Sequence, residues 1–355
     1  MHEFLNLLLD GLARGSIFGI IALGYTMVYG VIKLINFAHG EFFMAGAFAG
    51  YFFIRALPLE KIPLPWPWDS ALVFVLATLV AAAASTAVAL LAEFFAYRPL
   101  RSASKISLLL TTLGVSLLLQ NGCLKAFGSE TKSFPDPRKY VSLSQFSEGQ
   151  AVEDTYYTQT LSGDSVVVLS KDELFDLKKM ESKFPGGLPE KIYSRVLLSK
   201  TFKRVFAFVM LLILTAALVL LVHKSKLGVA MRAVSQNRMA AKLMGIDINF
   251  IVVATFVVGA TLAGAGGVIH GAYYTTVHPY MGFMPGVKAF VASVLGGIGS
   301  IPGAVMGSLM IGVLEVFAEG VGLAAYRDIL SFLLLILFLV FRPQGLFGKE
   351  GGEKL

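Results

Sequence analysis

The sequence predicts an all-α polytopic membrane protein: a bundle of about 8–9 transmembrane helices with a small external α+β insert. Of its 355 residues, 56% are hydrophobic and only 15% are charged, with a mean hydropathy of +0.72. A soluble chain of this length cannot bury that much apolar surface. The apolar residues also gather into segments close to the ~20 residues that cross a bilayer.

Nine apolar segments can be counted along the chain. They cover residues 12–32, 42–54, 71–96, 106–127, 205–222, 251–271, 285–298, about 304–317 and 329–341. The segments 42–54 and 285–298 are short, so either could be re-entrant instead of spanning. No basic residue precedes Arg14, so the first segment is interpreted as a retained span and not as a cleaved signal peptide. No internal sequence repeat is visible.

Basic residues set the predicted orientation. They concentrate in the stretches 97–105 and 223–250 and in the tail after residue 341, which marks all three as cytoplasmic. The N-terminus and the long polar stretch 128–204 then lie outside. We therefore expect N-terminal transmembrane helices over 1–127, an extracytoplasmic (periplasmic) insert over 128–204, and C-terminal transmembrane helices over 205–355.

Within the insert, two strands are expected over 151–161 and 166–169, around a Ser-Gly-Asp turn. Ser170 with Glu173 three residues later resembles a capping box, which predicts a helix through about Lys183. The insert is too short for a large independent core.

The cytoplasmic stretch 223–250 is more than a connector. Met231, Val234, Met239, Leu243 and Met244 recur at helical spacing. This pattern predicts a short helix, broken near residues 235–237, with one apolar and one basic side. Such a helix could rest on lipid headgroups or lie in the groove of a partner protein, and periodicity alone does not separate the two.

A second polar cluster interrupts the first two apolar segments at Asn36, His39 and Glu41. Ionisable groups at membrane depth usually face a cavity or a partner, which suggests part of a translocation path or a gate. The alternative is a cytoplasmic turn in which Glu41 pairs with Lys33 and His39 caps a helix. Chemistry alone favours the turn.

The third unusual stretch, 279–304, is rich in glycine and broken by proline. Broken helices expose backbone groups that can bind the carboxylate or ammonium group of a small zwitterion. Close helix packing is the favoured explanation for any single glycine. Lys288 is expected to extend its charge to the outer interface. The candidate path residues here are Gly296, Gly297, Gly299 and Pro302.

Isolated polar residues in the apolar segments are expected to form interhelical hydrogen bonds: Gln120, Asn121, His270 and Glu315. The histidines and carboxylates lack metal-ligand spacing, so neither a metal site nor a cofactor is predicted. A P-loop motif is absent from the sequence, as is a convincing catalytic constellation. Cys123 is the single cysteine, which excludes an internal disulfide.

Three of these stretches, together with Tyr-Arg-Pro-Leu-Arg at 97–101, resemble the branched-chain amino acid permease family of ABC transporters. The runs are Ala-Val-Ser-Gln-Asn at 233–237 with Met-Gly-Ile at 244–246, Ile-Asn-Phe-Ala-His-Gly-Glu at 35–41, and the stretch 279–304. In that family the cytoplasmic loop docks into a cleft on the ATPase. The resemblance therefore implies a coupling site made of Met231, Arg232, Ala233, Asn237, Ala240, Ala241, Met244, Gly245 and Ile246.

The resemblance implies the permease subunit of an importer for branched-chain or related small amino acids in the bacterial inner membrane. Its expected partners are two ABC ATPase subunits, a second permease forming a heterodimer, an extracytoplasmic substrate-binding protein and membrane lipid, with no nucleic acid. The resemblance leads us to expect a shorter external loop than 128–204, so the role of this insert is the part that transfers least, and relatives with similar signatures move urea, short amides or other amino acids. The alternative is an ion-gradient-driven secondary transporter that uses His39, Glu41 and Glu315 as ion carriers.

Overall fold

The computed structural model describes residues 2–57, 68–101, 103–135, 155–159, 166–170, 190–342 and 344–347. Seven helices in these parts are long and apolar enough to cross a membrane. They are α1 (His2–Ile32), α3 (Trp68–Ala92, continued by the π-helical turn Glu93–Tyr97), α4 (Lys105–Phe127), α7 (Glu190–Lys224), α10 (Ile248–Tyr274), α12 (Ile301–Gly320) and α13 (Arg327–Phe341, preceded by the 3-10 turn Ala324–Tyr326). The predicted all-α polytopic bundle is confirmed.

Two of the nine predicted segments form shorter helices. These are α2 (His39–Ala56) and α11 (Phe283–Gly296), the same two segments whose length left their spanning open. Most of α2 is buried in the bundle, including all of its residues from His39 to Met44. Neither helix has the length and composition of a full span.

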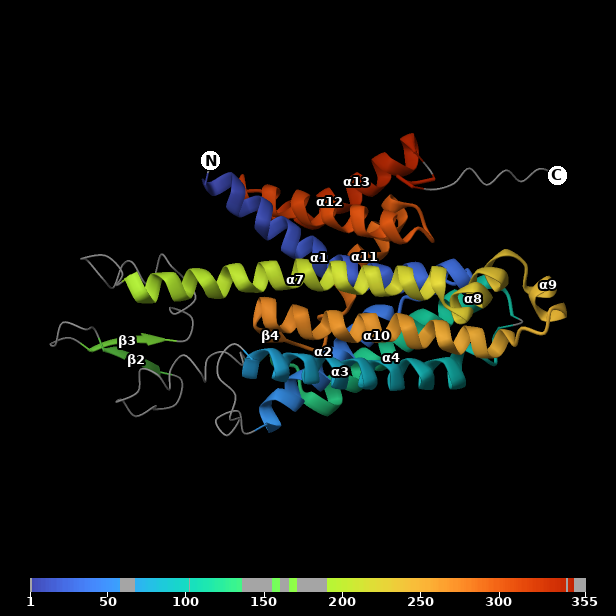
Figure 1. Cartoon of the computed structure of the whole chain (residues 1–355), viewed down its shortest axis with the longest axis horizontal. Coiled ribbons are helices and arrows are strands. Elements are labelled where there is room, and N and C mark those ends of the chain that lie inside the picture. Colours follow the sequence, from blue (N-terminus) through green and yellow to red (C-terminus); the bar gives the residue numbers. More distant parts are fainter. Residues whose placement is uncertain are drawn as a thin grey trace.

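The helices repeat one packing scheme on either side of α7. Helix α2 packs on α3 of its own half and on α10 of the other half. Helix α11 correspondingly packs on α12 of its own half and on α1 of the other half. Likewise α1 packs against α12, α10 packs against α3, and α1 and α10 cross each other. Since α1 and α10 run in opposite directions (Figure 1), this arrangement has the form of an inverted repeat, which the sequence alone does not reveal.

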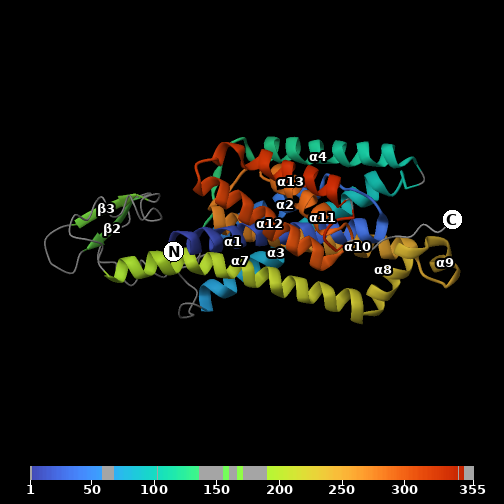
Figure 2. The same ribbon diagram turned by 90° about the horizontal axis from the view of Figure 1, so that it is seen from above.

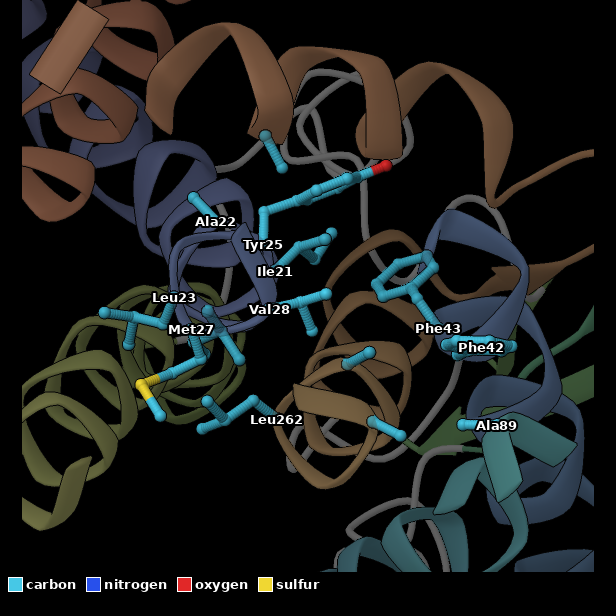
Figure 3. Packing of buried hydrophobic residues seen from close by; sticks show 14 of the residues in the cluster. Ile21, Ala22, Leu23, Tyr25, Met27, Val28, Phe42, Phe43, Ala89 and Leu262 are labelled. Atoms are coloured by element: carbon cyan, nitrogen blue, oxygen red, sulfur yellow. The ribbon is translucent and has the colours of Figure 1, made fainter. Parts of the chain in front are cut away.

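The centre of the bundle is filled by side chains from these crossing helices. Figure 3 shows Ile21, Tyr25 and Val28 of α1 near Phe42 and Phe43 of α2. Phe42, Phe43 and Ile21 are fully buried. The outer helices are far more exposed: α4 and α7 lie on opposite sides of the bundle (Figure 2). Their exposed leucine and isoleucine side chains suit contact with lipid or another helix.

Short strands lie near one end of the bundle. Strand β1 (Lys132–Ser133) pairs with β4 (Thr276–Val277), and Phe134 then packs against Gly271 of α10. Strands β2 (Thr155–Gln159) and β3 (Val166–Ser170) form an antiparallel hairpin, which confirms the two strands expected in the insert. The helix expected over 170–183 lies outside the described residues, apart from Ser170 at the end of β3. Helix α7 begins at Glu190, so the helical part of the chain starts earlier than the predicted boundary at residue 205.

Candidate functional site

Two short helices end the bundle opposite the β2–β3 hairpin (Figure 1). Helix α8 (Lys226–Gln236) is capped by Ser225, whose hydroxyl oxygen accepts a hydrogen bond from the Gly228 N–H over 2.9 Å. Helix α9 (Arg238–Leu243) is capped by Asn237, whose side-chain oxygen accepts from the Ala240 N–H over 3.0 Å. Asn237 has an extended backbone, so the predicted break near residues 235–237 is confirmed.

The apolar residues of α8 and α9 do not form the single side that the sequence predicts. Met231 and Val234 of α8 are 1% and 2% exposed. In contrast, Met239, Leu243 and Met244 are 75%, 88% and 82% exposed. The prediction was wrong because the break at Asn237 changes the direction of the chain. One apolar set therefore anchors α8 to the bundle, while the other forms an exposed patch on α9.

The other predicted coupling residues distribute over these two surfaces. Ala241 is the buried residue of α9, and Ala233 and Ile246 are half-buried. Arg232, Asn237, Ala240 and Gly245 are exposed. Gly245 ends α9 with a φ of 81°. The Ile246 N–H donates to the Ala241 carbonyl over 3.1 Å, which is a glycine-dependent helix ending.

The chain between α1 and α2 is an unwound stretch inside the bundle. Lys33 has a φ of 61°, and α2 begins only at His39. The His39 side chain lies against Gly24, which is about 12 Å along α1 from its end at Ile32. The interpretation of this region as a tight cytoplasmic turn was therefore wrong. Helix α2 begins beside the middle of α1, inside the bundle, and not at the end of α1.

Glu41 is completely buried in the first turn of α2. Its Oε1 atom accepts hydrogen bonds from Gln120 Nε2 over 2.6 Å and from Ser116 Oγ over 3.2 Å, both on α4. The interhelical bond expected of Gln120 is confirmed. Glu41 pairs with α4 and not, as the turn required, with Lys33. The Glu41 Oε2 and His39 Nε2 atoms are buried and have no hydrogen-bond partner among the described residues.

The beginnings of α2 and α11 meet at glycines beside Glu41. A Cβ atom at Gly286 would lie 3.0 Å from Gly40 Cα, and one at Gly282 would lie 3.1 Å from Glu41 Oε2. The two short helices thus abut backbone to backbone, in a contact that we call the half-helix junction (Gly40, Glu41, Gly282 and Gly286). Two stretches that resemble the family, 35–41 and 279–304, meet there.

Asn36 joins this junction to the Tyr-Arg-Pro-Leu-Arg run at 97–101, which also resembles the family. Its Oδ1 atom accepts hydrogen bonds from the Ala38 N–H over 3.1 Å and from the Tyr97 hydroxyl over 2.9 Å. Tyr97 opens the Tyr-Arg-Pro-Leu-Arg run. The arginines of that run, Arg98 and Arg101, both pair with the buried carboxylate of Glu93.

The glycines at the end of α11 and just after it allow close packing and turns of the backbone. Gly296 packs against Gly303 of α12, and Gly297 and Gly299 have φ values of 97° and 93°. The Leu295 and Gly296 carbonyls accept hydrogen bonds from the Leu346 and Phe347 N–H groups over 2.9 and 3.0 Å. Pro302 lies exposed in the first turn of α12. The two carbonyl groups that end α11 are therefore already hydrogen-bonded within the protein. That Gly296, Gly297, Gly299 and Pro302 line a translocation path stays a prediction.

Lys288 does not extend to an interface. Its side chain is buried, and its Nζ atom lies 2.6 Å from both Glu315 Oε1 and Asp328 Oδ1. Ser331 also donates to Glu315 over 2.9 Å, which confirms an interhelical bond at that residue. The expectation for Lys288 was wrong because its acidic partners lie on α12 and α13, far along the sequence.

The interhelical hydrogen bonds expected of Asn121 and His270 are not formed among the described residues, so these two expectations were wrong. Asn121 donates to the Leu117 carbonyl within α4, over 2.8 Å, and so bonds to its own helix. His270 packs against Tyr274 with 4.4 Å between ring centroids, and its buried Nδ1 atom lacks a hydrogen-bond partner within the described parts of the chain. Those same parts contain no group of three His, Cys, Asp or Glu residues that could hold a metal ion.

Comparison with known families gives a match over nearly the whole bundle. The family described as "Branched-chain amino acid transport system / permease component" matches residues 7–339. The chain belongs to this family. With seven helices able to cross a membrane, it is a multi-pass inner-membrane protein.

Individual proteins similar to this chain are also described as permease proteins. The high-affinity branched-chain amino acid transport system permease protein LivH of Salmonella typhimurium is 34% identical over 352 residues, covering 99% of this chain and 98% of the relative. BraD of Pseudomonas aeruginosa, which bears the same description, is 35% identical over 358 residues, covering 100% and 99%. The ribose import permease protein RbsC of Escherichia coli is 29% identical over 126 residues, covering 34% of this chain and 39% of the relative. No solved structure matches the chain.

Proposed function

We propose that the chain is the permease subunit of an ABC importer that carries branched-chain amino acids across the inner membrane, driven by separate ATPase subunits. The observation that carries this proposal is the exposed patch of Met239 and Leu243 on α9 with Met244, which caps its end. It lies on a helix pair that Met231 and Val234 anchor to the bundle. The names of LivH and BraD support the choice of substrate.

The patch has the properties of a docking surface for a soluble subunit. Three large apolar side chains exposed beyond the ends of the spanning helices mark an interaction site more often than a bare surface. The same helix pair carries the exposed basic residues Arg232 on α8 and Lys242 on α9, and charged residues of this kind form the polar rim of an interface. An ATPase cleft with an apolar floor and an acidic edge is the partner that fits.

The full assembly that we propose has two ATPase subunits, a second permease that makes a heterodimer, and an external substrate-binding protein. ATP-driven closure of the ATPases would displace α8 and α9 together, because they join directly at Asn237, whose N–H donates to the Ala233 carbonyl of α8 and whose side chain caps α9. The expected path residues Asn36, His39 and Glu41 lie where α2 begins, at the half-helix junction, and would respond to that displacement. The stretch 128–204 would face the binding protein.

The test uses the permease co-expressed with its candidate ATPases. Leu243→Asp and Met244→Asp place a charge on the exposed patch and should abolish co-purification of the ATPases and uptake of labelled leucine. Lys226→Asp is the control, because it also puts a new acid on this helix pair, outside the patch. ATPase binding that survives both patch variants would overturn the docking site. Leucine uptake that resists ATP depletion and collapses with an uncoupler would favour the ion-driven alternative.

A further inference from the structure

A side chain of α9 reaches the end of α1. Arg238, the first residue of α9, donates a hydrogen bond from Nη2 to the backbone carbonyl of Ile32, the last residue of α1. The last carbonyls of a helix have no partner within it and carry the negative end of the helix dipole. A guanidinium group suits that position in both hydrogen bonding and charge.

The residue held by Arg238 opens the unwound stretch that leads to the half-helix junction. Lys33, with its φ of 61°, follows Ile32 directly. Leu34 and Asn36 are then buried, at 7% and 1% exposure, and Asn36 is bonded to Tyr97. His39 begins α2. A shift of the Ile32 carbonyl is therefore passed along a short, packed segment to the first turn of α2.

Other basic side chains lie near Arg238, which is itself exposed. Arg101 donates to Asn249 Oδ1, at the start of α10, over 2.5 Å and also pairs with Glu93. Burial, and to a smaller extent the nearby charges of Arg98 and Arg238, lower the pKa of Arg101. Arg98 and Arg101 both pair with the Glu93 carboxylate, and the hydrogen-bond acceptor of Arg238 is the Ile32 carbonyl.

We propose that Arg238 is a positioning residue that ties α9 to the segment Lys33–Ala38, so that displacement of the coupling helices moves the start of α2. This inference rests on the proposed function for its role in transport, while the tie itself is a property of the permease alone. It assigns the transmission of force to one side chain, beside the general packing of α8 on the bundle.

The first experiment needs no partner protein. Hydrogen exchange is measured on the purified full-length permease in lipid nanodiscs, for the wild type, Arg238→Gln, Arg238→Lys and the control Arg232→Gln. Arg238→Gln should speed exchange in a peptide covering residues 33–38 by about fivefold, because the segment loses one hydrogen bond that holds its start. Arg238→Lys should restore most of the protection, since lysine keeps the charge and a donor. Arg232→Gln should match the wild type.

The second experiment separates transmission from docking. In the assembled importer, Arg238→Gln should lower the ratio of leucine transported to ATP hydrolysed by about fivefold and leave ATPase co-purification intact. Unchanged exchange at 33–38, or an unchanged transport ratio, would overturn the positioning role. Loss of ATPase binding would also overturn it, because Arg238 would then belong to the docking surface. If the wild type bound no ATPase while the exchange result held, the proposed function would fail and the tie would stand.

Discussion

The Tyr97 hydroxyl donates a hydrogen bond to the Asn36 side-chain oxygen over 2.9 Å, between two residues that are 2% and 1% exposed. Tyr97 ends the π-helical turn after α3, and its ring stacks on Phe256 of α10 with 5.5 Å between centroids. Asn36 lies in the unwound stretch before α2. The Tyr97 side chain therefore links this stretch, through its hydroxyl, to the end of the α3 segment and, through its ring, to α10.

Removing that hydroxyl should have a limited, measurable effect. Tyr97→Phe leaves Asn36 Oδ1 bonded to the Ala38 N–H, so the expected loss is about 1 kcal/mol of stability. Asn36→Ala removes both bonds and should cost about 2–3 kcal/mol. Thermal unfolding in detergent checks both, with Tyr326→Phe as the control because Tyr326 is 55% exposed. Equal melting of Tyr97→Phe and Asn36→Ala would contradict the shared bonding at Asn36.

The half-helix junction should tolerate no added methyl group. A Cβ atom at Gly282 would run into the Gly40 backbone, so Gly282→Ala forces the starts of α2 and α11 apart and should cost at least about 2 kcal/mol. The matched control is Gly114→Ala on α4, where nothing lies within 4 Å of the added atom. That control should be neutral or stabilise by up to about 1 kcal/mol, since alanine favours helix. Similar melting temperatures for the two variants would argue against the close contact.

The buried lysine should be essential to the second half of the bundle. Lys288→Met leaves Glu315 with Ser331 and with Arg14, whose nearest nitrogen is 3.7 Å away, and so leaves its charge poorly matched. Breaking a buried ion pair in this way typically costs about 3–5 kcal/mol. Adding Glu315→Gln should recover part of the loss, as unfolding measurements on the double variant would show. Lys125→Met, at an exposed position of α4, serves as the control.

Phe134 should secure the chain where it leaves α4. Its side chain is 2% exposed and lies against Gly271, with its ring centroid 6.5 Å from that of Tyr51. Phe134→Ala opens a cavity there and should lower stability by about 3–5 kcal/mol. Limited proteolysis should then cut faster after α4 than in Phe127→Ala, which removes a ring that is 38% exposed. Equal cutting rates would contradict an anchoring role.

The sequence predicts well what depends on neighbouring residues. The nine apolar segments correspond to helices because length and composition decide whether a segment can cross a bilayer. The break at Asn237 was predictable because asparagine caps a helix through its own side chain. The strands of the insert hairpin follow from residues that favour strands on either side of a Ser-Gly-Asp turn sequence.

Features that depend on distant contacts were not predictable in this way. The depth at which α2 begins is set by Gly24 and Gly282, which admit His39 and Gly40 into the bundle. Lys288 is buried because acids from two later helices reach it. The exposure of Leu243 follows from the direction that α9 takes after Asn237. A periodicity read over the whole stretch treats it as one continuous helix and so does not detect this change of direction.

The backbone bonds from Leu346 and Phe347 to the end of α11 have a practical consequence for handling this protein. A stop codon placed just after Phe341 would delete no residue of the last spanning helix, yet it would strip the Leu295 and Gly296 carbonyls of their donors. The turn between α11 and α12 would lose the two backbone hydrogen bonds that stabilise it. Purification tags should therefore follow residue 347, and shortened versions that end before it should be expected to express poorly.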